Sequence, residues 1–245
     1  GEAVGAPWHP HRGFETVTYL LDGRMRHEDS AGNHGELNPG DVQWMTAGRG
    51  IIHCEEPHEE ILRDGGRTHG FQIWVNLPAS HKMMRPRYQE VPSSESPTVE
   101  KNGVWARVIA GECMGEQSAI DTKIPITLIH IKMNRGSRLS QELESRLNGM
   151  IYVFGGEIEL ENEARVKKSP IAFGIRTKQQ IKDGELGLLS EGDVISITSK
   201  SDSEFLILAG PELNEPISRY GPFVMNTREE IEQAFIDYRN GTFVG

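Results

Sequence analysis

Two short motifs near the start of the chain carry residue types that bind transition metals. His9 and His11 are two positions apart, and His53 and Glu55 repeat that spacing further along the chain. Residues i and i+2 of a β-strand point to the same face, so each pair would direct both side chains to one side while Cys54 points away. Two such strands lying side by side would offer three imidazole nitrogens and one carboxylate oxygen.

This donor set favours particular metals. Neutral imidazole with carboxylate suits Fe(II), Mn, Co, Ni, Cu or Zn, whereas Ca and Mg favour oxygen ligands. Four protein ligands on an octahedral ion leave two positions for a substrate and O₂. The set is close to the two-histidine, one-carboxylate pattern of non-haem iron oxygenases, with one additional histidine. We therefore predict one mononuclear divalent metal.

The histidines concentrate in the first third of the chain. Of the nine, only His130 lies beyond position 81. Five of the other histidines are expected to lie in loops or on the surface, and we assign them no ligand role: His27, His34, His58, His69 and His81. The second half has no comparable pair near residues 136–140, where a duplicate of the first motif would fall, so we expect it to be metal-free.

Short β runs separated by Gly, Pro, Asn and Asp dominate the chain, which is typical of an all-β sandwich or barrel. The expected strands are Thr16–Leu21, Val42–Thr46, Phe71–Asn76, Val104–Ala110, Thr127–Met133, Met150–Phe154, Val194–Thr198 and Phe205–Ala209. One helix is expected at about residues 227–240, because Thr227 and Glu230 form a capping-box pattern and Gly241 is a typical helix stop.

A weak internal repeat predicts two copies of one β unit. Residues 19–26 align with residues 152–159, and residues 39–42 align with residues 191–194. The polar stretch 92–102 is the expected linker. We predict an N-terminal domain over residues 1–97 that holds the metal, and a metal-free C-terminal domain over residues 98–245 that includes the helix.

Two expectations concern segments outside these strands. The second copy has extra residues around 164–178, which we expect to form a long loop. The first metal motif begins only a few residues after Gly1, although a barrel needs strands before it. We therefore expect the first strands of the N-terminal domain to be missing from this sequence.

Composition narrows the classes of partner. The net charge of −10 and the pI near 5.4 argue against direct nucleic-acid binding and favour a small molecule or a protein. No run of 18 apolar residues exists that could span a membrane. The only cysteines, Cys54 and Cys113, are expected to be free thiols in a reducing cytoplasm, or also in the nucleus of a eukaryote.

Three segments resemble the pirin family nearly residue for residue: HPHRGFETVTYLLDG, NPGDVQWMTAGRGIIH and GPFVMNTREEIEQAF. The resemblance implies an all-β bicupin, with two cupin-type antiparallel β-barrels and a C-terminal helix. It also implies the ligands His9, His11, His53 and Glu55, with iron as the usual ion. The general cupin pattern would instead use Glu15, which we keep as the lesser candidate for the carboxylate.

Residues beside the ligands have supporting roles in this interpretation. Arg12 and Gln43 are polar neighbours that could orient the ligands. The remaining candidates for the surroundings of the metal are Phe14, Glu15, Trp44 and Met45.

The resemblance implies two alternative functions. Some pirins resemble quercetin 2,3-dioxygenases, which open a flavonol ring with O₂ and release CO. In that reaction the metal lowers the pKa of the flavonol hydroxyl, and Glu55 is the candidate base that takes its proton. The alternative is a non-enzymatic, iron-dependent regulator that contacts transcription factors or metabolic enzymes.

Overall fold

The structure, a computed structural model, describes residues 5–160, 180–190 and 192–244. The chain forms two compact units, one of residues 1–95 and 213–245 and the other of residues 96–212. The boundary near residue 96 lies close to the expected one. The C-terminal segment 213–245 groups with the first unit, whereas the expected division placed it with the second. Within the described residues, no helix has the length and apolar character needed to cross a membrane.

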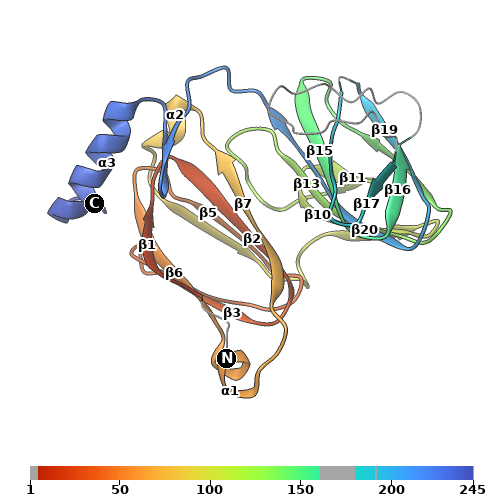
Figure 1. Cartoon of the computed structure of the whole chain (residues 1–245), viewed down its shortest axis with the longest axis horizontal. Helices are drawn as coiled ribbons and strands as arrows, with labels where there is room; N and C mark the ends of the chain where they lie inside the picture. Colours follow the sequence, from red (N-terminus) through yellow and green to blue (C-terminus); the bar gives the residue numbers. More distant parts are fainter. Residues whose placement is uncertain (1–4, 161–179, 191, 245) are drawn as a thin grey trace. The chain divides into compact units, whose positions relative to one another are not determined.

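The first unit is built from two facing antiparallel sheets (Figure 1). One has the order β1-β6-β3-β4 and the other the order β7-β2-β5-β8. The first sheet contains β1 (Ala6–His11), β6 (Ile51–Pro57), β3 (Met25–Asp29) and β4 (His34–Leu37). The second contains β7 (His69–Asn76), β2 (Phe14–Asp22), β5 (Val42–Thr46) and β8 (Arg87–Val91). The sheets are not closed into one hydrogen-bonded ring, and this double-sheet form is one that cupins adopt.

The second unit repeats the two-sheet plan. Its larger sheet contains β18 (Leu186–Leu188), β15 (Leu147–Gly155), β20 (Ser203–Pro211), β13 (Thr127–Met133), β10 (Val104–Ala110) and β9 (Thr98–Lys101). Its smaller sheet contains β14 (Arg138–Glu142), β19 (Val194–Ser199), β16 (Glu157–Leu160) and β17 (Gln180–Lys182). A hairpin joins β11 (Glu112–Cys113) to β12 (Glu116–Gln117). Buried side chains such as Ile129, Val153 and Phe205 form its core.

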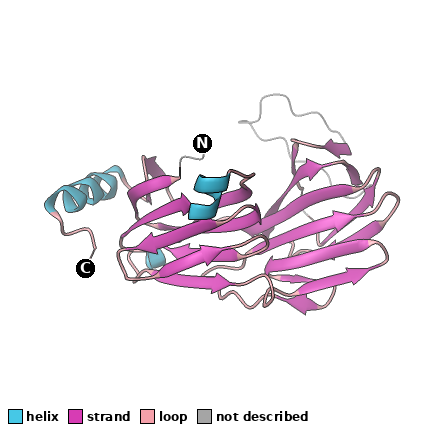
Figure 2. Ribbon diagram, turned by 90° about the horizontal axis from the view of Figure 1, so that it is seen from below, coloured by secondary structure: helices cyan, strands magenta, loops and turns pink. Residues whose placement is uncertain are grey.

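All eight predicted strands are present, and strands dominate the ribbon view in Figure 2. The expected linker is shorter than 92–102, because its last residues form β9, which pairs with β10. The loop expected at 164–178 lies outside the described residues.

The predicted C-terminal helix, α3 (Arg228–Asn240), is confirmed with both of its caps. Thr227 and Glu230 form a reciprocal capping box, and Gly241 adopts the left-handed conformation at the other end. Its buried residues, Ile231 and Ala234, pack with side chains of β22 (Phe223–Met225), whose hairpin partner is β21 (Ser218–Tyr220). This apolar contact holds the C-terminal segment within the first unit.

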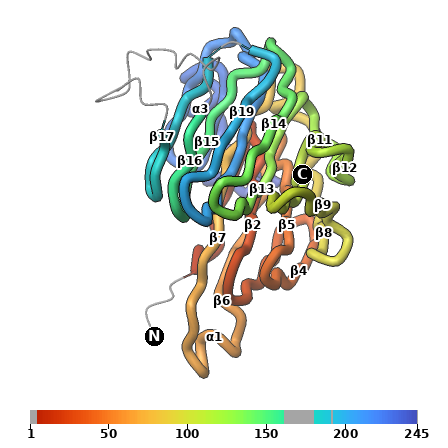
Figure 3. Tube along the Cα trace, turned by 90° about the vertical axis from the view of Figure 1, so that its right-hand side faces the viewer, coloured from red at the N-terminus to blue at the C-terminus, as the bar shows by residue number. Residues whose placement is uncertain are grey.

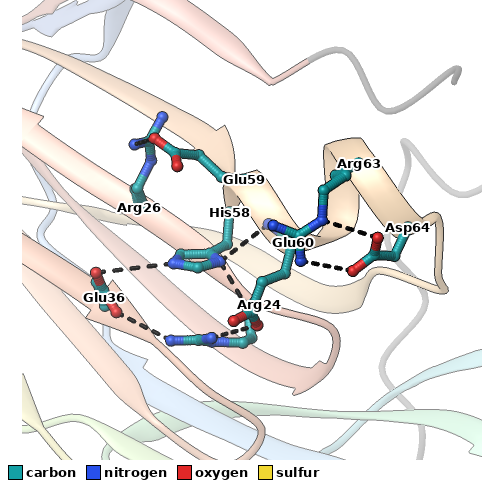
Figure 4. A network of polar contacts seen from close by, with 8 residues as sticks. All are labelled: Arg24, Arg26, Glu36, His58, Glu59, Glu60, Arg63 and Asp64. Carbon is teal, nitrogen blue, oxygen red and sulfur yellow. Dashed lines mark hydrogen bonds and ion pairs between the residues drawn. The ribbon is translucent and has the colours of Figure 1, made fainter.

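The short helix α1 (Glu59–Asp64) lies in a charged network (Figure 4). His58 caps it by accepting a hydrogen bond from the Glu60 backbone N–H at 3.2 Å. Arg24 forms ion pairs with Glu36 and Glu60 in the same network. His58 therefore has a structural role at the start of this helix.

Lys82, at the end of α2 (Ala79–Lys82), joins three segments of the first unit. Its buried ammonium donates hydrogen bonds of 2.8 Å to Gly13 O, Asn76 Oδ1 and Val224 O. Gly13 lies in the turn after β1, Asn76 in β7 and Val224 in β22. Of these elements, β7 runs in one sheet with β2 and β5 (Figure 3). Burial lowers the pKa of Lys82 to about 8, although Glu215 and Glu230 act in the opposite direction.

We expect Lys82→Met to lower the free energy of unfolding by about 1–3 kcal/mol at pH 7, because two buried carbonyls lose their donor. The folded pKa of Lys82, about 8, lies below its ordinary value of 10.5, so between these values the unfolded chain binds more protons. The stability of the unmutated protein relative to the variant should therefore rise with pH over this range. Urea unfolding at pH 7, 8.5 and 10 measures the difference.

Lys182→Met is the matched control, because Lys182 is an exposed lysine whose contact with Glu157 is a surface ion pair. It should change stability by less than about 0.5 kcal/mol at each pH. Parallel pH profiles for the unmutated protein and Lys82→Met would contradict the assignment of a depressed pKa to Lys82.

Candidate metal centre

Three of the four predicted ligands converge where β1 pairs with β6. The antiparallel register places His9 directly opposite His53. The ring centroids are 4.6 Å apart for His9 and His11, 4.3 Å for His9 and His53, and 5.0 Å for His11 and His53. One nitrogen from each ring lies within 4.8 Å of the other two, a spacing that one metal ion can bridge.

Hydrogen bonds define which nitrogen of His9 and His11 faces the centre. His9 Nδ1 donates to Pro7 O at 2.7 Å, and His11 Nδ1 donates to Pro222 O at 3.2 Å. Because a carbonyl oxygen only accepts, both Nδ1 atoms carry a proton, so the Nε2 atoms are the ones that could offer a lone pair to a metal. The His53 Nε2 atom is buried without a hydrogen-bond partner among the described residues.

The distance between the two Nε2 atoms fits a shared ion. His9 Nε2 and His11 Nε2 are 3.0 Å apart. Two nitrogens bound to one metal at about 2.1 Å and at a right angle would be about 3.0 Å apart. A cation between the lone pairs would turn their mutual repulsion into attraction, so the histidines present here fit a mononuclear metal.

The electrostatic environment keeps two of these rings neutral. Burial lowers the pKa of His11 to about 4, opposed by its hydrogen bond to Pro222 and helped by the neighbouring His9. Burial also lowers the pKa of His53 to about 2, with further lowering from His11, His9 and His27. Metal ligation requires the neutral ring, so these shifts favour binding down to weakly acidic pH.

Glu55, the predicted carboxylate ligand, is buried on the same face of β6 as His53. The Thr18 hydroxyl donates to Glu55 Oε1 at 2.8 Å. Glu55 shares a cluster of ligand atoms with His53 and His27, whereas His9 and His11 form their cluster with His53. Glu55 therefore lies close to His53 and His27, but it is not in the cluster that His9 and His11 form with His53.

Four of the predicted neighbours lie beside this group. Gln43 pairs with Thr18 across the two strands, and Thr18 is the residue that donates to Glu55. Gln43 and Met45 therefore lie on the same face of this sheet as Thr18. The Phe14 ring packs edge-on against His11 at 5.0 Å. Arg12 anchors the strand end that carries His11, with Nη1 2.7 Å from Asp237 Oδ2 of α3.

Glu15 and Trp44 lie on the opposite side of the same sheet. Glu15 is paired with Thr46, whose hydroxyl donates to Glu15 Oε1 at 2.6 Å, and Trp44 is paired with Val17. Successive side chains of a strand alternate in direction, so both point away from the face that carries Thr18 and Gln43.

His27 and Trp74 are residues near the centre that the sequence interpretation did not assign to it. The His27 side chain is fully buried, and its Nδ1 lies 3.4 Å from His53 Nδ1. His27 and Asp29 are two positions apart, like the predicted ligand pairs. This spacing is the signal in the sequence that could have placed His27 near the centre. The exposed Trp74 ring lies 5.5 Å from the ring of His11.

This fold and site define a two-unit, cupin-type β protein with a histidine-rich candidate metal centre. Family models described as "Pirin" and "Pirin C-terminal cupin domain" match residues 1–75 and 128–244. Human pirin is 42% identical over 243 residues, which cover 98% of this chain and 78% of the human protein. The chain belongs to the pirin family.

Two bacterial relatives extend the comparison. A Pseudomonas aeruginosa protein named provisionally as a quercetin 2,3-dioxygenase is 44% identical over 246 residues, covering 97% of this chain and 80% of that protein. A crystal structure named as quercetin 2,3-dioxygenase from Acinetobacter baumannii is 36% identical, with a TM-score of 0.88, and the match covers 99% of this chain and 80% of that one.

We expect His11→Ala and His53→Ala each to weaken the binding of Co(II) or Ni(II) by more than about 100-fold, since even the loss of an outer hydrogen-bond partner costs 10–100-fold. Metal content after loading and gel filtration measures this, together with calorimetric titration. His34→Ala is the control, because His34 is exposed on β4. Undiminished metal content in His53→Ala would contradict the site.

A second pair of variants separates the two candidate carboxylates. Glu55→Gln should weaken metal binding, because it removes the charge beside His53, while Glu15→Gln should leave the affinity unchanged within about twofold. The same titrations test this. Weaker binding in Glu15→Gln alone would return the ligand role to Glu15 and contradict the strand-face argument.

Proposed function

We propose that this chain binds one divalent metal through His9, His11, His53 and Glu55, and that it is a dioxygenase of quercetin-like flavonols. The observation that carries the proposal is the convergence of three imidazoles, with two Nε2 atoms 3.0 Å apart. The names of the Acinetobacter and Pseudomonas relatives support the substrate class. The overall reaction consumes O₂, opens the central flavonol ring and releases CO.

Iron is the proposed ion, with Mn, Co, Ni, Cu and Zn as alternatives that the same donors accept. A bound ion of this kind supplies a Lewis acid that lowers the pKa of the flavonol hydroxyl. Glu55 is the proposed acceptor of the hydroxyl proton, since its buried carboxylate lies beside His53. The exposed Trp74 ring, which packs 4.3 Å from the buried Phe14 ring next to His11, offers an apolar surface for the aromatic rings of the substrate.

Turnover assays with defined metals test this proposal. Metal-free protein is loaded anaerobically with Fe(II), and in parallel with each alternative ion, before quercetin and O₂ are added. We expect the flavonol absorbance to fall with release of CO, and we expect His53→Ala to abolish both. His34→Ala should retain them. Absence of turnover with every ion would contradict the enzymatic proposal while leaving metal binding intact.

The regulatory alternative is favoured by one observation. Pro222 accepts a hydrogen bond from His11, and Arg12 binds Asp237 of α3, so the C-terminal segment contacts both the ligand and its neighbour. The helix also exposes Ile236 and Tyr238. In this alternative, the oxidation state of a bound iron would alter the affinity for a protein partner. Pull-downs with Fe(II)-loaded and Fe(III)-loaded protein would show that difference.

A further inference from the structure

A row of buried polar groups leads away from the candidate metal centre behind His53. The Asp29 Oδ2 atom lies 3.4 Å from His27 Nε2, and His27 Nδ1 lies 3.4 Å from His53 Nδ1. The side chains of His27 and Asp29 are fully buried. At the other side of the His53 ring, Nε2 is the buried atom without a partner among the described residues.

Strand register creates this row. β3 pairs antiparallel with β6, with Asp29 opposite His53 and His27 opposite Glu55. Both strands carry their pairs at i and i+2, so all four side chains share one face. A shift of one residue would turn the β3 pair to the other face and break the row.

The Asp29 carboxylate is held in a fixed orientation. Its Oδ1 accepts from the backbone N–H groups of Ala31 and Asn33 at 2.8 and 3.0 Å, and its Oδ2 accepts from Asn33 Nδ2 at 2.8 Å. Burial alone would raise the pKa of Asp29, but the hydrogen bonds from His27 and from this turn outweigh it and lower the pKa to about 2. Asp29 is therefore an anion that accepts from His27.

The direction of each hydrogen bond follows from this anion. Asp29 only accepts, so His27 carries a proton on Nε2, and the Gln43 amide nitrogen, which only donates, makes His27 Nδ1 an acceptor. The Gln43 amide donates to His27 Nδ1 at 2.8 Å, and His53 Nδ1 lies 3.4 Å from the same atom, so a His53 Nδ1–H would share the single lone pair of His27 Nδ1 with Gln43. With its proton on Nδ1, His53 presents the Nε2 lone pair to the site that His9 and His11 also face.

We propose that His27 and Asp29 are a positioning pair that holds His53 in its metal-binding tautomer and increases the basicity of its Nε2. The proposal rests on the proposed role of His53 as a ligand. In metal sites, a carboxylate that accepts a hydrogen bond from a ligating histidine fixes the tautomer of that histidine and raises its basicity. Here the His27 imidazole lies between the Asp29 carboxylate and His53. His9 and His11 donate to the backbone carbonyls of Pro7 and Pro222, so His53 is the ligand candidate whose Nδ1 contacts a side-chain pair.

The experiment compares Co(II) affinity and the visible Co(II) spectrum in four variants. Asp29→Asn and His27→Leu should each weaken binding by 10–100-fold and shift the spectrum, because His53 loses its anionic support or its acceptor. His27→Gln should recover most of the affinity, because its carbonyl oxygen can accept from His53 Nδ1. Thermal unfolding of each metal-free variant reports whether the fold is intact.

Asp41→Asn is the matched control. Asp41 is also a buried aspartate that accepts turn N–H groups, from Asn38 and Ser93, but it has no histidine contact among the described residues. It should lower stability while leaving Co(II) affinity and spectrum unchanged within about twofold. This separates a positioning effect on His53 from a general loss of turn structure.

Two results would overturn the inference. One is that Asp29→Asn and His27→Leu both bind Co(II) with the affinity and the spectrum of the unmutated protein. The other is an equal loss in His27→Gln and His27→Leu, which would make His27 itself a ligand, because His27, His53 and Glu55 also satisfy ligand spacing. If the unmutated protein binds no ion, the proposed function fails instead. Quercetin turnover has no bearing on these binding measurements.

Discussion

The register between β1, β6 and β3 is the constraint on which the rest of the first unit depends. Each strand carries a pair of ligand-type residues two positions apart, and pairing places His9 opposite His53 and His27 opposite Glu55. Strand alternation then turns these side chains to one face. The polar groups are buried together because of this register, and the second sheet contributes Thr18 and Gln43 from its facing side.

Burial of so many polar groups requires a partner for each. The Nδ1 atoms of His9 and His11 donate to carbonyls, Thr18 donates to Glu55, and Asp29 accepts from a turn. Among the described residues, His53 Nε2 is a buried histidine nitrogen without a hydrogen-bond partner, and the His9 and His11 Nε2 atoms approach each other to 3.0 Å. A cation would be a suitable partner for these nitrogens, because neutral imidazole is a good ligand for transition metals.

The C-terminal segment completes the first unit although it follows the second unit in sequence. It supplies Pro222 O to His11, Val224 O to Lys82 and Asp237 to Arg12. These contacts surround the turn that joins β1 to β2, so the position of His11 depends on residues more than two hundred positions away. Contacts at this turn therefore join the C-terminal segment to the strand that carries His9 and His11.

Local patterns in the sequence determined the strands, the capped C-terminal helix and the spacing of the candidate ligand pairs. Each depends on alternation, capping or turn residues within a few positions. The sequence could not show that Glu15 and Trp44 face away from the centre, that His27 is buried behind His53, or that the C-terminal segment returns to the first unit. Only tertiary structure decided these, because strand pairing and long-range packing choose which face is enclosed and which distant segments meet.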